Sequence, residues 1–146
     1  MTEIVLVAID FSAASDRALA EAVTLGRALG ARLELVHVHE VALTPVPPML
    51  ELATLPPPAE QVALTEAALA ERAQQVTAAG VPCATYATFG RPAEEVVRRA
   101  ADVRPHLLVV GTRGRSRLRH VLVGSTATHI VQRAPCPVLV VPSPAE

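Results

Sequence analysis

The fold is decided near the start of the chain by an apolar run, Ile4-Val5-Leu6-Val7-Ala8-Ile9, which ends at Asp10. Its β-branched residues favour a strand, and the lack of polar alternation predicts that both faces of this strand are buried. A strand that is buried on both faces is typical of a parallel sheet covered by helices. The run therefore predicts an α/β protein.

Outward from this run, short apolar strands alternate with amphipathic helices along the chain. Further strands are expected at 33–39, 82–89, 107–110 and 138–141, and helices at 12–29, 59–79, 92 to just before Pro105, and about 126–133. This alternation predicts a Rossmann-like, doubly wound five-stranded parallel sheet in the order 3-2-1-4-5, with helices on both faces. We expect residues 1–146 to form a single domain, in which the less apolar strand 82–89 lies at an edge.

Prolines interrupt this alternation once. Residues 40–58 contain six of the thirteen prolines of the chain. Because proline removes a backbone donor and fixes φ, we expect a long, semi-rigid loop without regular structure over this range.

Composition excludes several classes of function. The 146 residues are 51% hydrophobic and 18% charged, which predicts a compact globule. No lysine occurs, which excludes a P-loop, a Schiff-base or pyridoxal enzyme and a receiver-type phosphoacceptor site. With only three aromatic residues and no DNA-reading motif, we expect no nucleic-acid partner. No membrane span or leader is evident, and the two cysteines are isolated, so we expect a soluble, cytoplasmic protein.

Positive charge is concentrated in the C-terminal third. Residues 103–145 contain six arginines and no acidic residue, whereas residues 1–102 contain seven arginines and thirteen acidic residues. Four of these arginines lie together, at Arg113, Arg115, Arg117 and Arg119. They suit a triphosphate by charge and forked geometry, although a solvated face or a nucleic-acid patch is also compatible with the pattern.

Glycines follow the fourth expected strand in a distinctive spacing. Gly111-Thr112-Arg113-Gly114 is separated by nine residues from Gly124-Ser125-Thr126, which begins a helix. Glycines allow close approach of backbone to a ligand, and a helix N-terminus attracts anions, so the segment reads as a phosphate cradle. The alternative is that the glycines only form turns and that Ser125 only caps the helix.

The spacing Gly-x2-Gly-x9-Gly-Ser resembles the nucleotide signature of the ATP-binding branch of the universal stress protein family. The resemblance extends along nearly the whole chain in the correct order: 7–12 is similar to the family's opening strand and turn, 36–38 to the end of its second strand, 90–92 to its mid-chain turn and 135–141 to its last strand. Two positions depart from the pattern. Ala8 stands where ATP-binding members often have proline, and His106 where the fourth strand usually begins with aspartate.

The resemblance implies a role for particular residues. Asp10 would bind the ribose hydroxyls, the backbone of Val38 would pair with adenine, and the glycine segment would hold the phosphates. The full set expected to bind nucleotide is Ala8, Ile9, Asp10, Val38, Val110, Gly111, Arg113, Gly114, Gly124, Ser125 and Thr126. We expect ATP, or AMP or ADP, as ligand, with Mg²⁺ held mainly through the phosphates, and neither a catalytic residue nor a protein metal site.

Asp10 also has a case that is independent of the family. A carboxylate at the carboxyl end of a central strand is well placed for a sugar diol, although an acid beside Ser12 could simply belong to a helix start. His37 and His39 share one strand face, so a metal pair is conceivable, but a site would need a third ligand.

Three functions remain in order of preference. The first is an ATP-binding stress-response or signalling module that forms a homodimer through strand 138–141, since an apolar edge strand invites pairing. The second is a slow ATP hydrolase, and the third is a ligand-free dimeric interaction protein. We expect at most weak ATPase activity because no carboxylate occurs in residues 103–145.

Overall fold

The chain folds into alternating strands and helices. A computed structural model describes residues 2–46, 51–112 and 124–143, with only the backbone described for 43–46 and 51–54. In chain order its elements are β1 (Ile4–Ala8), α1 (Ala13–Leu29), β2 (Arg32–Glu40), β3 (Ala42–Val46), β4 (Glu51–Leu55), α2 (Ala59–Ala78), β5 (Cys83–Gly90), α3 (Pro92–Val103), β6 (Leu107–Gly111), α4 (Ser125–Arg133) and β7 (Val138–Val141).

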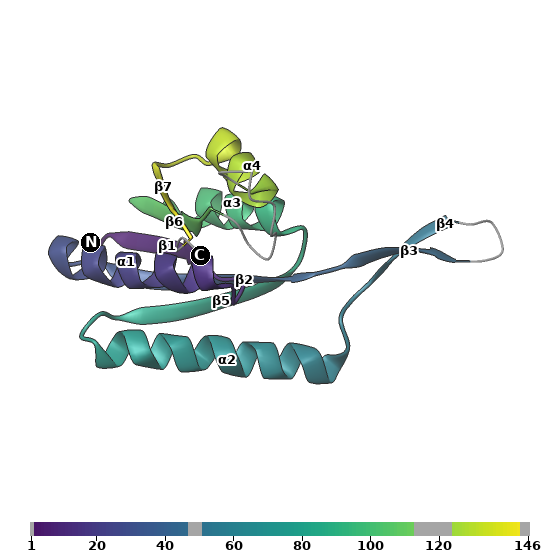
Figure 1. The fold of residues 1–146 in the computed structure, drawn as a ribbon, viewed down its shortest axis with the longest axis horizontal. Helices are drawn as coiled ribbons and strands as arrows, with labels where there is room; N and C mark the ends of the chain where they lie inside the picture. The colour runs from purple at the N-terminus through teal and green to yellow at the C-terminus, as the bar shows by residue number, and fades with distance from the viewer. Residues whose placement is uncertain (1, 47–50, 113–123, 144–146) are drawn as a thin grey trace.

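Five strands form one parallel sheet in the order β5-β2-β1-β6-β7 (Figure 1). Val5 of β1 pairs with Leu33 of β2 on one side and with Leu107 of β6 on the other. This is the predicted order 3-2-1-4-5, which is therefore confirmed, as is the edge position of the strand predicted at 82–89. The carboxyl ends of β1 and β6 consequently lie side by side.

Each face of the sheet carries its own hydrophobic core. Val5 and Val7 of β1 pack with α1 and α2, while Leu6 packs with α3 and α4 on the opposite face. All three side chains have an exposed fraction of 0%. The uninterrupted apolar run of β1 thus reflects burial on both sides, as the sequence predicted. Within the described ranges, no helix combines the length and apolar character that a membrane crossing requires.

Helix ends follow local chemistry. Ser12 caps α1 by accepting a hydrogen bond from the Ser15 N–H, and Gly30 ends α1 in a left-handed conformation at φ 64°. Pro92 occupies the first turn of α3, where no intrahelical donor is needed. These three signals were all legible in the sequence.

An ion pair ties α3 to the sheet. Glu34 on β2 is 7% exposed, and its Oε1 accepts a hydrogen bond from Arg99 Nε at 2.6 Å. The Arg99 guanidinium also lies over the Tyr86 ring, 3.9 Å from its centroid. The hydrogen bond to Glu34 raises the pKa of Arg99 above its ordinary value.

Burial, together with the negative charge of Glu34, raises the pKa of the Cys83 thiol to about 11.

The range 40–58 differs from its prediction. Instead of an irregular loop, β3 and β4 form a two-stranded antiparallel ribbon, which projects away from the body of the molecule (Figure 1). Pro45 is within β3, opposite Leu52. A two-stranded ribbon tolerates proline because each strand has an outer side on which a missing N–H breaks no ladder bond. The prediction of a loop without regular structure was therefore wrong.

Candidate functional site

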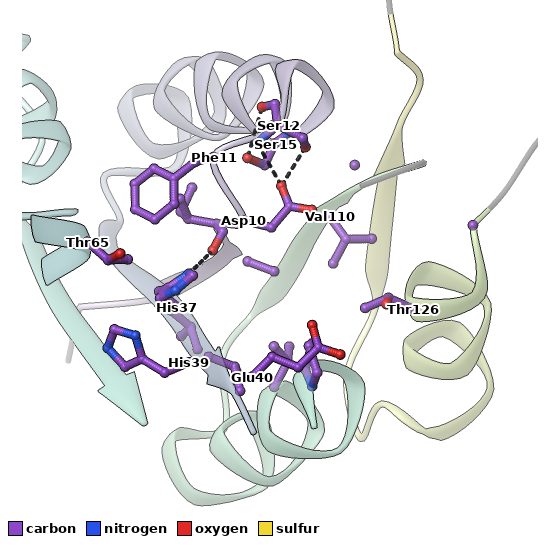
Figure 2. A pocket seen from close by; sticks show the side chains of 18 of the residues that line it. Asp10, Phe11, Ser12, Ser15, His37, His39, Glu40, Thr65, Val110 and Thr126 are labelled. Carbon is purple, nitrogen blue, oxygen red and sulfur yellow. Dashed lines mark hydrogen bonds between the residues drawn. The ribbon is translucent and has the colours of Figure 1, made fainter. Parts of the chain in front are cut away.

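A pocket of about 710 Å³ opens at the carboxyl ends of the parallel strands (Figure 2). It lies where the chain winds in opposite directions from β1 and β6, which is the place where doubly wound sheets bind their ligands. Its walls come from the ends of β1, β2 and β6 and from the N-terminal parts of all four helices. The partial positive charge of helix N-termini favours an anion here.

The turn after β1 forms one wall. Asp10 Oδ1 accepts hydrogen bonds from Ser12 N at 2.9 Å and from Ser12 Oγ at 2.5 Å. Between them, Phe11 has φ 63°, which is left-handed and uncommon for a bulky residue. Ser12 Oγ in turn accepts from Ser15 N at 3.1 Å and so starts α1. Because two donors engage Oδ1, Oδ2 is the carboxylate oxygen left for a ligand.

The end of β6 forms the facing wall. A Cβ added at Gly111 would lie 2.8 Å from both the backbone carbon and the Cβ of Ala14. Glycine is therefore required at this position to let β6 end against the start of α1, irrespective of any ligand. The sequence predicted that Gly111 either approaches a phosphate or forms a turn, and packing against α1 is a role that sequence reasoning missed.

Thr112 and Gly124 close the base of the segment between β6 and α4. The Gly124 N–H donates to the Thr112 carbonyl, and Thr112 Oγ1 accepts from Ser143 N at 3.1 Å. Thr112 itself is 8% exposed. The two ends of the segment 113–123 are thus held together beside the pocket.

Helix α4 begins at this point, with a glycine as its N-cap. Its N-cap, Gly124, makes no side-chain capping bond, and Ser125 and Thr126 are exposed and line the pocket. The first N–H groups of a helix have no intrahelical acceptor. Together with two hydroxyls, they form a set of donors suited to phosphate oxygens.

The end of β2 supplies an aromatic wall. The His37 ring lies 5.1 Å from the Phe11 ring and 4.9 Å from the His39 ring, measured between centroids. His37 Nδ1 donates to the Ile9 carbonyl at 2.7 Å, and His39 Nε2 contacts Glu66 Oε1 at 3.2 Å. Both histidines therefore have structural contacts that need no metal ion. In the described part of the chain, no group of three or more His, Cys, Asp or Glu side chains could hold a metal ion.

Sequence reasoning did not anticipate the wall formed by α2. Gln61 and Thr65, one helical turn apart, line the pocket, and so do the prolines at 56–58 that precede the helix. Figure 2 shows Thr65 on the same side of the pocket as His37 and His39. A polar pair at i, i+4 after a proline run is the only local signal, and it does not specify which face turns inward.

The structure brings most of the predicted site residues together. Those that line the pocket are Ala8, Ile9, Asp10, Val38, Val110, Gly111, Gly124, Ser125 and Thr126. Arg113 and Gly114 lie outside the described residues, as do Arg115, Arg117 and Arg119. Among the described lining residues, the carboxylates of Asp10 and Glu40 carry formal charge. Among the described lining groups, positive potential therefore comes from the helix N-termini.

The fold is that of a doubly wound α/β protein with a pocket at the topological switch point. Comparison with known proteins then identifies its family. The sequence pattern of the Universal stress protein family matches residues 1–142, so the chain belongs to this family.

Three relatives illustrate the similarity. A universal stress protein in the QAH/OAS sulfhydrylase 3′ region of Thermus aquaticus is 37% identical over 145 residues, covering 97% of this chain and 99% of the relative. The solved UspA from Lactobacillus plantarum has a TM-score of 0.80 at 27% identity, covering 95% of this chain and 97% of the other. A universal stress protein solved in complex with cAMP has a TM-score of 0.68 at 27% identity, covering 95% of each chain.

Proposed function

We propose that the pocket binds an adenine nucleotide, with ATP as the preferred ligand, and that the protein is a nucleotide-binding module of stress response or signalling. One observation carries the proposal. The N-terminus of α4, which has no side-chain cap, opens into the same pocket as Asp10 and the end of β2. An anion site and a sugar-binding carboxylate are thereby adjacent. The relative in complex with cAMP supports an adenine nucleotide as the ligand class.

Each part of the nucleotide has a counterpart in the pocket. The phosphates would accept hydrogen bonds from the first turn of α4 and from the hydroxyls of Ser125 and Thr126. Asp10 Oδ2 would accept from the ribose hydroxyls, and the backbone of Val38 would pair with adenine. The aliphatic residues expected beside them are Ala8, Ile9 and Val110, with Gly111 at the turn. Arg113 and Gly114 would complete the phosphate end.

The size and chemistry of the pocket fit this ligand. A volume of about 710 Å³ is within the range typical of small-molecule sites. Four arginines in the segment between β6 and α4 favour ATP over AMP because they match the larger negative charge. Mg²⁺ would be held mainly by the phosphates and water, since Asp10 and Glu40 alone cannot form a carboxylate cage.

We expect turnover to be slow. Phosphoryl transfer requires a positioned water, and the sequence from 103 to 145 contains no carboxylate. Asp10 Oδ1 is already engaged by Ser12. Glu40, which lines the pocket from the end of β2, keeps weak hydrolysis as the second candidate. The test measures phosphate release from ATP by wild type and by Glu40→Gln. Equal release by the two proteins favours a binding module, and slower release by Glu40→Gln favours a hydrolase.

Assembly is proposed to be a homodimer through β7. This strand lies at the edge of the sheet, and its apolar sequence Val138-Leu139-Val140-Val141 pairs with β6 on one side. An open apolar edge favours pairing with a second copy. We expect this dimer to act in the cytoplasm, where the free cysteines Cys83 and Cys136 would stay reduced. Light scattering at micromolar concentration tests the dimer, and a monomer would contradict it.

The decisive experiment combines mass spectrometry with calorimetry. Ligand released from freshly purified protein should be an adenine nucleotide, and titration should rank ATP above AMP and both above GTP. Released ligand of another class would refute the proposal. A protein that releases nothing and gives no binding heat with any nucleotide would instead favour the ligand-free dimeric interaction protein.

A further inference from the structure

We propose that Arg72, on α2, is a positioning residue of the nucleotide site: it holds Phe11 in its left-handed conformation and so fixes the orientation of Asp10. The inference rests on the proposed nucleotide binding for its functional consequence. Its structural part concerns the β1–α1 turn of the ligand-free protein and can be tested without any ligand.

The backbone of Phe11 needs support from outside the turn. Its φ of 63° lies in the left-handed region, which residues with a Cβ adopt only at a cost. Asn, Asp and Gly are the residues that tolerate this region best. An aromatic residue persists there when its surroundings over-determine the conformation.

Arg72 provides such support across a long stretch of sequence. Its guanidinium carbon lies 4.7 Å from the centroid of the Phe11 ring, a cation–π distance. Its Nε contacts Asp16 Oδ1, on the first turns of α1, at 3.1 Å. The Arg72 side chain is only 24% exposed. Arg72 therefore contacts both the ring of Phe11 and the helix that follows it.

A second polar neighbour of the Phe11 ring belongs to β2. The His37 ring packs at 5.1 Å with an interplanar angle of 56°, and Figure 2 shows both rings at the pocket. His37 is itself bonded to the Ile9 carbonyl, directly before Asp10. The ring of Phe11 is thus contacted from β2 and from α2.

The consequence for the ligand site follows from chain connectivity. Phe11 separates Asp10 from Ser12, and both hydrogen bonds between these two residues span its backbone. A change of Phe11 to negative φ would reorient Ser12 relative to Asp10 and so alter the two hydrogen bonds to Asp10 Oδ1. The carboxylate would then lose the orientation that aims Oδ2 at the ribose.

A double-mutant cycle tests this chain of effects. The variants are Arg72→Met, which keeps an unbranched side chain but removes the charge, Phe11→Gly, which accepts positive φ without support, and the combination. We expect Arg72→Met to weaken ATP binding roughly three- to tenfold, measured by calorimetry. In the Phe11→Gly background the same change should alter the affinity less than about twofold, because no ring remains to be held.

Two further variants guard the experiment. Arg98→Met removes another arginine–carboxylate pair, Arg98 Nη1 to Glu95 Oε1 at 2.6 Å, remote from Phe11, and should leave affinity unchanged. Phe11→Asn, which also tolerates the left-handed region, replaces Phe11→Gly if the glycine variant does not fold. An equal loss of affinity on Arg72→Met in both backgrounds, or no loss in either, overturns the proposal.

A ligand-free measurement separates this inference from the proposed function. Backbone couplings and Cα shifts of Phe11, measured by NMR, report φ directly. Arg72→Met should populate negative φ at Phe11, whereas Arg98→Met should not. If wild type binds no nucleotide but Phe11 shifts in Arg72→Met, the proposed function fails and the control of the turn by Arg72 stands. If φ is unchanged, Arg72 does not hold Phe11 and the inference fails.

Discussion

The two turns that border the pocket differ in length and in how the helix after each turn is capped. Between β1 and α1 the chain turns within four residues, 9–12, and Ser12 satisfies both Asp10 and the first turn of α1. Between β6 and α4 it takes thirteen residues, 112–124, and α4 begins without a side-chain cap. The short turn is organised by its own hydrogen bonds, whereas the helix that follows the long one has no side-chain cap for its first N–H groups. Neighbouring turns can therefore serve one pocket in opposite ways.

The largest effect is expected from a change at the N-terminus of α4. Gly124→Val should abolish detectable ATP binding, a loss of more than roughly 100-fold, because a branched side chain at the helix start blocks the phosphates. Calorimetry measures the affinity. The matched control is Gly30→Ala, at the far end of α1 with φ 64°, which should lower the melting temperature and leave affinity intact. Equal ATP affinity in Gly124→Val and wild type would remove the site from this turn.

Asp10→Asn tests the short turn between β1 and α1. Asparagine keeps an acceptor for Ser12 but loses the charge, so ATP affinity should fall roughly 10- to 100-fold while the fold remains stable. Titration with 2′,3′-dideoxy-ATP is the control, because a ligand without ribose hydroxyls should bind both proteins equally. If the loss persists with the dideoxy nucleotide, Asp10 does not act on the ribose.

Gly111→Ala tests the contact between the end of β6 and the start of α1, next to both turns. The new Cβ would meet the Ala14 backbone, and we expect a destabilisation of about 1–3 kcal/mol, measured by urea unfolding. Adding Ala14→Gly should restore only part of the stability, because the backbone carbon and oxygen of residue 14 remain 2.8 and 2.9 Å away. A fully stable Gly111→Ala that binds ATP poorly would show that this glycine serves the ligand instead.

The smallest effect concerns the cap itself. Ser12→Ala should lower stability by about 1 kcal/mol because α1 loses its N-terminal acceptor. Thr24→Ala, which removes an exposed hydroxyl bonded to the Ala20 carbonyl within the same helix, is the control and should be close to neutral in urea unfolding. Similar losses in both variants would mean that the cap contributes no more than an ordinary surface hydroxyl.

The sheet could be predicted from sequence because its signals are local and agree with one another. The unbroken apolar run of β1 indicates burial on both faces of this strand, and Ser12 and Gly30 mark the ends of α1. The ribbon of β3 and β4 could not be predicted from the sequence, because proline disfavours a strand. Pro45 is acceptable in β3 only because of how the two strands pair.

The candidate site was predictable to the extent that it lies next to strand ends. Asp10, Val38 and Gly111 each follow or end a recognisable strand, and the parallel sheet gathers such positions at one edge. Gln61 and Thr65 belong to a helix whose orientation depends on tertiary packing. The contact of Gly111 with Ala14 is likewise invisible in a sequence where the two positions are far apart.

The central place of β1 also governs when the pocket can exist. Its neighbour β2 follows after a single helix, but Leu107, which pairs with Val5 on the other side, comes about one hundred residues later in the chain. During synthesis, the first strand therefore emerges long before the partner that completes its second side, and contacts of such long range form slowly. Asp10 and the start of α4 meet only when nearly the whole polypeptide has been made. Any molecule that binds between them recognises the finished protein and discriminates against every nascent intermediate.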